Sequence, residues 1–355
     1  MHLRRVRPAG LVRAGPGAPG RATRPETAVF PRCAAPARSG TREVFRGRGI
    51  PAGTWPFCHG VQTHFPSGDG SGHGAGLTLA PFRGVRYDLS RVGGLANVTS
   101  PPYDVIGPGT LEELRAASPY NVVRLILPDY AQGTAAADRA ADGAAGHAAD
   151  HAAASLLRAW LDDGALAVDD EPALYVYEQR GPGWVQRGLV GLVGVGTAAV
   201  HPHENVMPGP VAGRRELMKA TKSNLEPILL AYNGGPEPVP AGLSASALTD
   251  QVADGTEPDA RAVTGDGVTH RLWAVTDPKL HHAIAADLAT RTALIADGHH
   301  RYAAYRELRE EMRAGGAGAG PWDYGLAFLV DVDAYPLRLG PIHRVLPHLG
   351  PADAT

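Results

Sequence analysis

Cysteine is almost absent from this chain of 355 residues. The only two, Cys33 and Cys58, lie near the N-terminus, so the rest of the sequence holds no disulfide framework or cysteine metal site. No apolar run approaches the roughly 20 residues that a membrane-spanning helix needs. The net charge of −2 leaves no overall basic field to attract nucleic acid or an anionic membrane. We therefore expect a soluble, cytoplasmic protein.

Acidic residues and lysine are scarce at the N-terminus, where residues 1–50 contain eleven Arg, no Lys, no Asp and two Glu. This segment shows neither a helical nor a strand period. It also lacks the amphipathic stretch of a transit peptide and the apolar segment of a signal peptide. We expect residues 1–76 to be a disordered extension and residues 77–355 to form a single α/β domain. Because the chain stops soon after another apolar run, that domain could be incomplete at its C-terminus.

From residue 77 onward, strand and helix patterns interleave. Alternating or continuous apolar runs predict strands at 77–88, 121–128, 172–180, 185–197, 270–277, 292–297 and 324–333, and one at the end of 201–233. Helical spacing predicts helices at 109–119 (with Thr110 as N-cap), 135–161, 212–224 and 279–289, and after Gly298. The segments 172–180 and 185–197 are expected to form a hairpin. Without strict βαβ regularity, this order predicts a mixed α/β sheet.

A cluster of polar residues and one glycine, Asp297 to Arg301, lies between a predicted strand and a predicted helix. A glycine that opens a helix lets the backbone approach an anion, because the first helical N–H groups are unpaired. Asp297 could cap the helix, hold Mg²⁺ or act as a base. His299, His300 and Arg301 oppose the helix dipole, so a simple cap does not account for them, whereas phosphate oxygens would. We interpret this corner as an anion site.

A second cluster follows in "HPHENV" (201–206) and on the helix after it. It offers the donor groups His201, His203, Glu204, Asn205, Arg214 and Arg215. A carboxylate with an amide suits a Mg²⁺–phosphate complex, and we favour a functional role for Glu204 because it follows a strand end. For the two arginines, solvated surface positions are an equal alternative. Tyr103 and Asp104 could form a third wall of the site or cap a turn.

The corner "ADGHHRYAAYREL" resembles the strand-turn-helix signature of the ParB/sulfiredoxin superfamily, which includes chromosome-partitioning nucleotidases, sulfiredoxin and a free serine kinase. In that superfamily the corner grips nucleotide phosphates, and Gly298, His300 and Arg301 occupy the matching places. The motifs "SPPYDVI", "PALYVYEQ", "HPHENV", "NLEPILLAY" and "ADGHHRY", in this order, also resemble the bacterial and archaeal family called domain of unknown function 1015.

The superfamily resemblance also extends to the second cluster. Glu204, Asn205 and a following arginine are similar to residues that hold the metal and triphosphate there, although the spacing to Arg214 or Arg215 is longer here. The implied fold is a ParB/sulfiredoxin-like nucleotide-binding core with an added N-terminal helical region. The implied cofactor is ATP or ADP with Mg²⁺.

The implied activity is phosphoryl transfer to a small hydroxylated metabolite, with serine as the analogy. The expected roles are catalysis by Asp297 and Glu204; nucleotide binding by Gly298, His299, His300, Arg301, Asn205, Arg214 and Arg215; and metal binding by Glu204, Asp297 and His203.

Two other functions stay open. One is a nucleotide-dependent regulatory module of ParB type, which would need a basic DNA-binding surface that the sequence does not indicate. The other is a hydrolase in which His201, His203, His299 and His300 hold Zn²⁺ and Glu204 is the general base. Sulfiredoxin-like chemistry is excluded because the corner has no cysteine.

Overall fold

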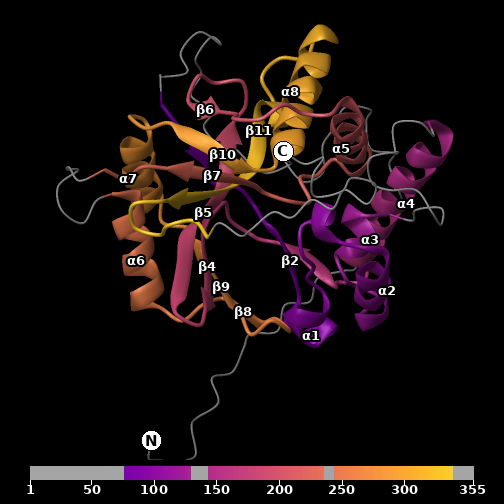
Figure 1. Ribbon diagram of the computed structural model, residues 1–355, viewed down its shortest axis with the longest axis horizontal. Helices are drawn as coiled ribbons and strands as arrows, with labels where there is room; N and C mark the ends of the chain where they lie inside the picture. Colours follow the sequence, from indigo (N-terminus) through magenta and orange to yellow (C-terminus); the bar gives the residue numbers. More distant parts are fainter. Residues whose placement is uncertain (1–75, 129–142, 236–243, 339–355) are drawn as a thin grey trace, which may run out of the picture. The chain divides into compact units, whose positions relative to one another are not determined.

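The computed structural model describes residues 76–128, 143–235 and 244–338 (Figure 1). The prediction for residues 1–76, including both cysteines, therefore falls almost entirely outside the described residues. The helices are α1 (Leu89–Val92), η1 (Leu95–Asn97), η2 (Tyr103–Val105), α2 (Pro108–Ala117), α3 (Val123–Ile126), α4 (Gly143–Asp162), α5 (Pro208–Thr221), α6 (Ala245–Gly255), α7 (Pro278–Leu288), α8 (His299–Ala314) and η4 (Pro321–Asp323). The strands are β1 (Leu79–Ala80), β2 (Val85–Tyr87), β3 (Leu166–Val168), β4 (Leu174–Gly181), β5 (Trp184–Gly194), β6 (Val200–His201), β7 (Ile228–Tyr232), β8 (Ala260–Val263), β9 (Thr269–Val275), β10 (Ala293–Asp297) and β11 (Tyr324–Asp331).

Nine strands form one mixed sheet, which confirms the predicted mixed α/β class. Their order is β6-β10-β7-β11-β5-β4-β9-β8, with β1 paired to β5. The β6–β10 and β7–β11 pairs are parallel, and the other pairs are antiparallel. In Figure 1, α6 and α7 flank one side of this sheet and α5 and α8 the other.

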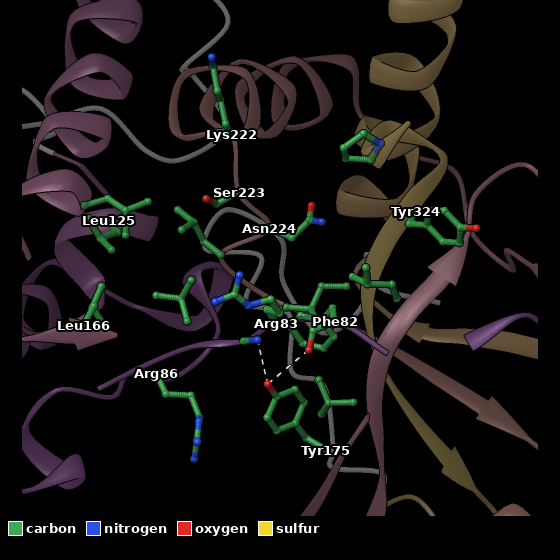
Figure 2. Close-up of a pocket in the computed structure, with 18 of the residues that line it drawn as sticks. Phe82, Arg83, Arg86, Leu125, Leu166, Tyr175, Lys222, Ser223, Asn224 and Tyr324 are labelled. Atoms are coloured by element: carbon green, nitrogen blue, oxygen red, sulfur yellow. Dashed lines mark hydrogen bonds between the residues drawn. The ribbon is translucent and has the colours of Figure 1, made fainter. Parts of the chain in front are cut away.

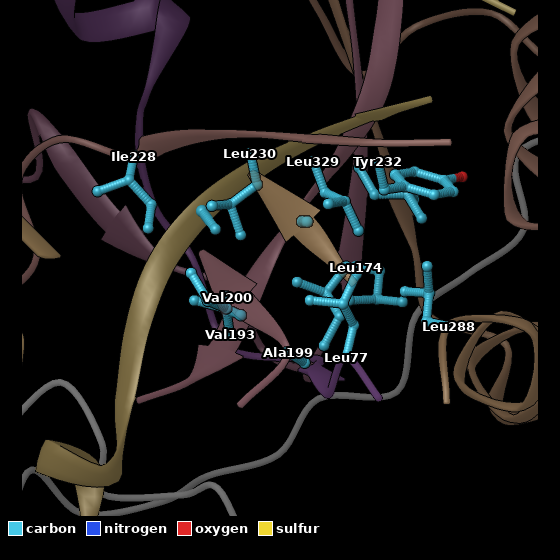
Figure 3. Packing of buried hydrophobic residues seen from close by; sticks show 14 of the residues in the cluster. Leu77, Leu174, Val193, Ala199, Val200, Ile228, Leu230, Tyr232, Leu288 and Leu329 are labelled. Carbon is cyan, nitrogen blue, oxygen red and sulfur yellow. The ribbon is translucent and has the colours of Figure 1, made fainter. Parts of the chain in front are cut away.

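The main core lies against the central strands of the sheet. Leu174 of β4, Ile228 and Leu230 of β7 and Leu329 of β11 are almost completely buried, and Leu288 of α7 packs into the same cluster (Figure 3). Burying a leucine or isoleucine side chain contributes about 1.5–3 kcal/mol each. The predicted hairpin is also confirmed, because β4 and β5 pair from Tyr175–Val190 to Gly181–Trp184.

The helices α1 to α4 and the two-stranded sheet β2–β3 form a helical region before the large sheet (Figure 1). The predicted strand at 121–128 is wrong, because residues 123–126 form the single helical turn α3. The side chain of buried Asn121 accepts the N–H of Val123 at 3.0 Å and donates to the carbonyls of Asn97 and Thr99, which favours a turn. A short apolar run does not distinguish strand from helix by its period.

Two details of the predicted helices are also corrected. Helix α2 begins at Pro108 after Gly107, so Thr110 lies inside it and is not its N-cap. The predicted helix at 135–161 is described only from Gly143, and α4 continues through Gly146 without a break. Among the described residues, no helix combines the length and the apolar content needed to cross a bilayer.

Candidate functional site

The pairing of β6 with β10 brings the two polar clusters of the sequence together. Because these strands are parallel, with His201 opposite Leu294, the segments that follow them leave the same edge of the sheet. The segment after β6 is the loop 202–207, and the one after β10 is the turn at Gly298. Strand β7 runs antiparallel to β10 and therefore starts at this edge, with Glu226 just before it.

The turn at Gly298 requires glycine for two reasons. Its φ of 91° lies in the left-handed region that other residues rarely adopt. A Cβ there would also lie 2.9 Å from Arg301 Nε and from Ile228 Cγ2. The turn opens α8, whose N-terminus has no capping side chain. The first N–H groups of α8 therefore point out of the helix with the positive end of its dipole.

Arg301 points inward from this turn and is only 4% exposed. Its guanidinium pairs with Asp297 and lies 3.4 Å from Glu226 Oε1. Arg214 approaches the other oxygen of Glu226 at 3.3 Å and lies 4.0 Å over the ring of Tyr103. Tyr103 also donates its backbone N–H to Glu226 at 3.3 Å. These five residues form a buried ion-pair cluster behind the turn, which we call the Arg301 cluster.

Burial and charge act against each other within the Arg301 cluster. Burial raises the pKa of the Glu226 carboxyl, and the guanidinium groups of Arg214 and Arg301 oppose that shift. Burial disfavours the charged form of Arg301, but Glu226 and Asp297 outweigh it and raise its pKa. The Nε of Arg301 is buried and has no hydrogen-bond partner among the described residues. This nitrogen lies directly behind Gly298, 2.9 Å from where a Cβ of that residue would stand.

His299 ties the loop 202–207 to the turn. Its Nδ1 lies 3.0 Å from Glu204 Oε1, and its Nε2 accepts the backbone N–H of His203 at 3.4 Å. An Nε2 that accepts leaves the proton on Nδ1, so His299 is neutral and donates to Glu204. Burial lowers the pKa of His299, which favours the same neutral form, and Glu204 opposes the shift.

His300 makes a second link to the loop. Its Nε2 accepts the backbone N–H of Met207 at 3.1 Å, directly before α5. Helix α5 also lacks a capping side chain, so the N-termini of α5 and α8 are joined through this contact. Val206 and Met207 expose their side chains beside it. The loop thus presents polar groups and an apolar rim next to the turn.

The structure separates the predicted site residues into two groups. Asp297, Gly298, His299, His300, Arg301, His203, Glu204 and Arg214 lie at the turn, in the loop or in the Arg301 cluster. Arg215, by contrast, pairs with Glu307 at 2.9 Å and Glu311 at 3.8 Å on the outer side of α8. Asp104 is exposed. Asn205 lies in the loop 202–207 but is also exposed and has no hydrogen-bond partner in the described part of the chain.

Glu226 was not identified as a site residue from the sequence. It belongs to the motif "NLEPILLAY", and the signal is a carboxylate directly before a proline and a buried strand. Nothing in that pattern says that the carboxylate turns inward toward two arginines from other segments. The structure therefore adds Glu226 to the Arg301 cluster and places Tyr103 against Glu226 and Arg214.

Two carboxylates at the sheet edge remain accessible. The side chain of Asp297 is 47% exposed, with Oδ2 held by Arg301, and that of Glu204 is 56% exposed, with Oε1 held by His299. Across the described ranges, no three His, Cys, Asp or Glu side chains gather closely enough to hold a metal ion by themselves. The site therefore combines an open helix N-terminus with two oriented carboxylates.

The chain is thus a mixed α/β protein with a polar site at one edge of its sheet. The family described as "Protein of unknown function (DUF1015)" matches residues 79–355, well over half of the sequence, and the chain belongs to this family. All five motifs quoted for that resemblance lie within the matched residues. Neither a curated protein nor a solved structure matches the chain.

Proposed function

We propose that this chain binds ATP or ADP with Mg²⁺ at the turn after β10 and transfers a phosphoryl group to a small hydroxylated metabolite. The observation that carries this is the uncapped start of α8 at Gly298, because such N–H groups bind phosphate oxygens. A second donor is the Nε of Arg301 beside the same turn, which is buried and has no hydrogen-bond partner among the described residues. The similarity of this corner to the ParB/sulfiredoxin superfamily supports the same ligand and that type of core.

The arrangement gives each residue at the edge a distinct task. Backbone N–H groups of α8 hold the phosphates, and His300 keeps the start of α5 beside them. Arg301 holds one oxygen of Asp297, and the side chain of Asp297 is still 47% exposed, so that its second oxygen is left for the acceptor. The acceptor hydroxyl oxygen attacks the terminal phosphorus, the bond to the bridging oxygen breaks, and Asp297 takes the hydroxyl proton. The nucleotide leaves shorter by one phosphate, as phosphoryl transfer requires.

The donor set at the edge suits Mg²⁺ better than Zn²⁺. With a nucleotide, Mg²⁺ usually takes one or two protein carboxylates and completes its shell with phosphate oxygens and water. Glu204 would supply such an oxygen, which leaves the free oxygen of Asp297 to take the proton, and the bound ion would neutralise charge on the transferred group. Zn²⁺ takes three or four protein donors, whereas both ring nitrogens of His299 are already engaged by Glu204 and His203. We therefore do not favour the zinc hydrolase.

Asp297→Asn is expected to lower kcat for phosphoryl transfer about 10²–10⁴-fold, because the amide cannot accept the hydroxyl proton. Nucleotide affinity should change far less, since the N–H groups of α8 are retained. The assay incubates the full chain with ATP or ADP, Mg²⁺ and serine first, then other hydroxylated metabolites, and detects the phosphorylated product by mass spectrometry.

Arg215→Ala is the matched control for this variant. Arg215 sits in an exposed ion-pair network between α5 and α8, so its loss should cost less than about 1 kcal/mol of stability and leave transfer unchanged. An Asp297→Asn protein with parental kcat would contradict the assignment of the base. If nucleotide binds but no hydroxylated acceptor is phosphorylated, the transferase proposal fails and the regulatory module takes its place.

A further inference from the structure

A cavity of about 330 Å³ is lined in part by residues 222–225, directly before Glu226 in the chain. It lies between residues of the helical region (α3, α4, β2 and β3) and residues of β5 and β11 in the large sheet, and it is partly open to solvent. Its walls are mostly apolar and include Leu125, Leu157, Leu166, Leu192 and Leu326. Its size reaches the lower end of the range for small-molecule sites, which are typically 300–1,000 Å³.

Three cationic side chains, Arg83, Arg86 and Lys222, line this apolar cavity. Arg86 and Lys222 each have an interaction partner, whereas the position of Arg83 is unusual. Arg83 lies among the lining residues in Figure 2, between the 222–224 turn and Tyr175. Its Nε donates to the carbonyl of Asp169 at 2.6 Å, which fixes the guanidinium. Its two terminal nitrogens have no hydrogen-bond or ion-pair partner among the described residues. A half-buried guanidinium with both terminal nitrogens open is suited to bind a carboxylate through two parallel hydrogen bonds.

The nearest acidic side chain does not neutralise Arg83. The carboxylate of Asp169 accepts Arg86 Nε at 2.7 and 2.9 Å and also the hydroxyl of Tyr175. Arg86 lines the same cavity but turns its guanidinium away from the other lining side chains (Figure 2). Asn224 also lines the cavity and has no hydrogen-bond partner in the described part of the chain (Figure 2). The cavity therefore combines apolar walls with one uncompensated positive charge and one amide.

We infer that this cavity is a binding site for a small carboxylate with an apolar body, whose carboxylate pairs with Arg83. The apolar body would contact the leucines of α3, α4 and β5, and Asn224 would donate to the same head group. This inference does not depend on the nucleotide site. The two sites nevertheless share one segment, because residues 222–225 line the cavity and Glu226 belongs to the Arg301 cluster.

Isothermal titration of the full chain with decanoate tests the inference, with 1-decanol as the uncharged ligand of equal length. We expect saturable binding of decanoate that weakens about fourfold for each methylene removed in nonanoate and octanoate. Decanol should bind at least about tenfold more weakly, because it cannot form the charged pair. A separate titration with 2-naphthoate shows whether the cavity prefers a carboxylate with an aromatic body to one with an aliphatic body.

Arg83→Gln should weaken decanoate binding at least about tenfold and leave decanol binding unchanged. Arg158→Gln is the matched control, since Arg158 is exposed on α4 and does not line the cavity, and it should change the affinity by less than about twofold. Equal binding of decanoate and decanol to the parent overturns the inference even if Arg83→Gln fails to fold. The inference is also overturned if neither decanoate nor 2-naphthoate shows saturable binding, or if a folded Arg83→Gln protein binds decanoate with unchanged affinity.

Discussion

Gly298→Ala is expected to weaken nucleotide binding at least about tenfold and to cost about 2–3 kcal/mol of stability. The residue would adopt a φ of 91° that alanine disfavours, and its Cβ would press on Arg301 Nε and Ile228 Cγ2 at 2.9 Å. Relief of that crowding must move either the guanidinium or the turn. Both changes displace the first N–H groups of α8, which are the proposed phosphate donors. Calorimetric titration with Mg-ATP and urea unfolding measure the two effects.

Gly316→Ala is the control that separates the effect of backbone strain on stability from an effect on nucleotide binding. Gly316 follows the other end of α8, has a φ of 83° and would place its Cβ in open space. It should cost about 1 kcal/mol for the disfavoured φ and leave nucleotide affinity unchanged. If both glycine variants bind nucleotide as the parent does, the turn at Gly298 is not the phosphate site.

Glu178→Gln is expected to lower the free energy of unfolding by about 3–5 kcal/mol, although Glu178 lies outside the proposed site. Glu178 is completely buried in β4 and faces an arginine on each neighbouring strand, Arg187 of β5 and Arg271 of β9. Arg187 Nη2 lies 2.7 Å from the carboxylate, and Arg180 approaches it at 3.2 Å. An amide would leave Arg187, itself buried, without its main counter-charge.

The pH dependence of Glu178 has a definite sign. Burial would raise its pKa, but hydrogen bonds from Arg187, Arg271 and Arg180 outweigh burial and hold the pKa below its ordinary value. A carboxyl with a lowered folded pKa stabilises the protein above its unfolded pKa of about 4.3, and this stability is lost as the pH falls through the folded pKa. Urea unfolding at pH 7 and below pH 4 should show the difference between parent and Glu178→Gln shrinking on acidification.

A variant of a neighbouring acid controls for a general loss of charge. Asp254 approaches Arg187 at 3.3 Å, but its side chain is 74% exposed. Asp254→Asn should therefore cost less than about 1 kcal/mol. A loss for Glu178→Gln that is no larger than the loss for Asp254→Asn would show that the buried arginines do not need Glu178.

The parts of the fold that sequence predicted correctly are those with long periodic patterns. Alternation in 172–180 and 185–197 predicts the β4–β5 hairpin, and Tyr302, Tyr305 and Leu308 at helical spacing predict α8, on which all three are buried. The strand predicted at 121–128 was wrong because the helical turn found there depends on hydrogen bonds from the side chain of Asn121 to distant carbonyls. Helix α6 and strand β8 were not predicted.

Only part of the candidate site could be predicted from the sequence. The residues of the turn could be singled out because histidine and arginine at a helix start oppose the helix dipole. The contact between the turn and Glu204 depends on the parallel pairing of β6 with β10. Strand β6 has only two residues and therefore shows no periodic pattern in the sequence. The inward orientation of Arg301 depends on Glu226, which lies more than seventy residues earlier in the chain.

The most direct test of the central claim is thermal unfolding of the full chain with ATP, ADP, CTP or GTP, each with Mg²⁺, and with Zn²⁺ alone. A ligand that binds only the folded state stabilises it by about 2.7 kcal/mol at one hundred times its Kd, which raises the Tm by a few degrees. We predict such a rise with at least one Mg-nucleotide, and its loss in His300→Ala. A Tm that responds to Zn²⁺ alone, or to no nucleotide, would contradict a phosphate site at the start of α8.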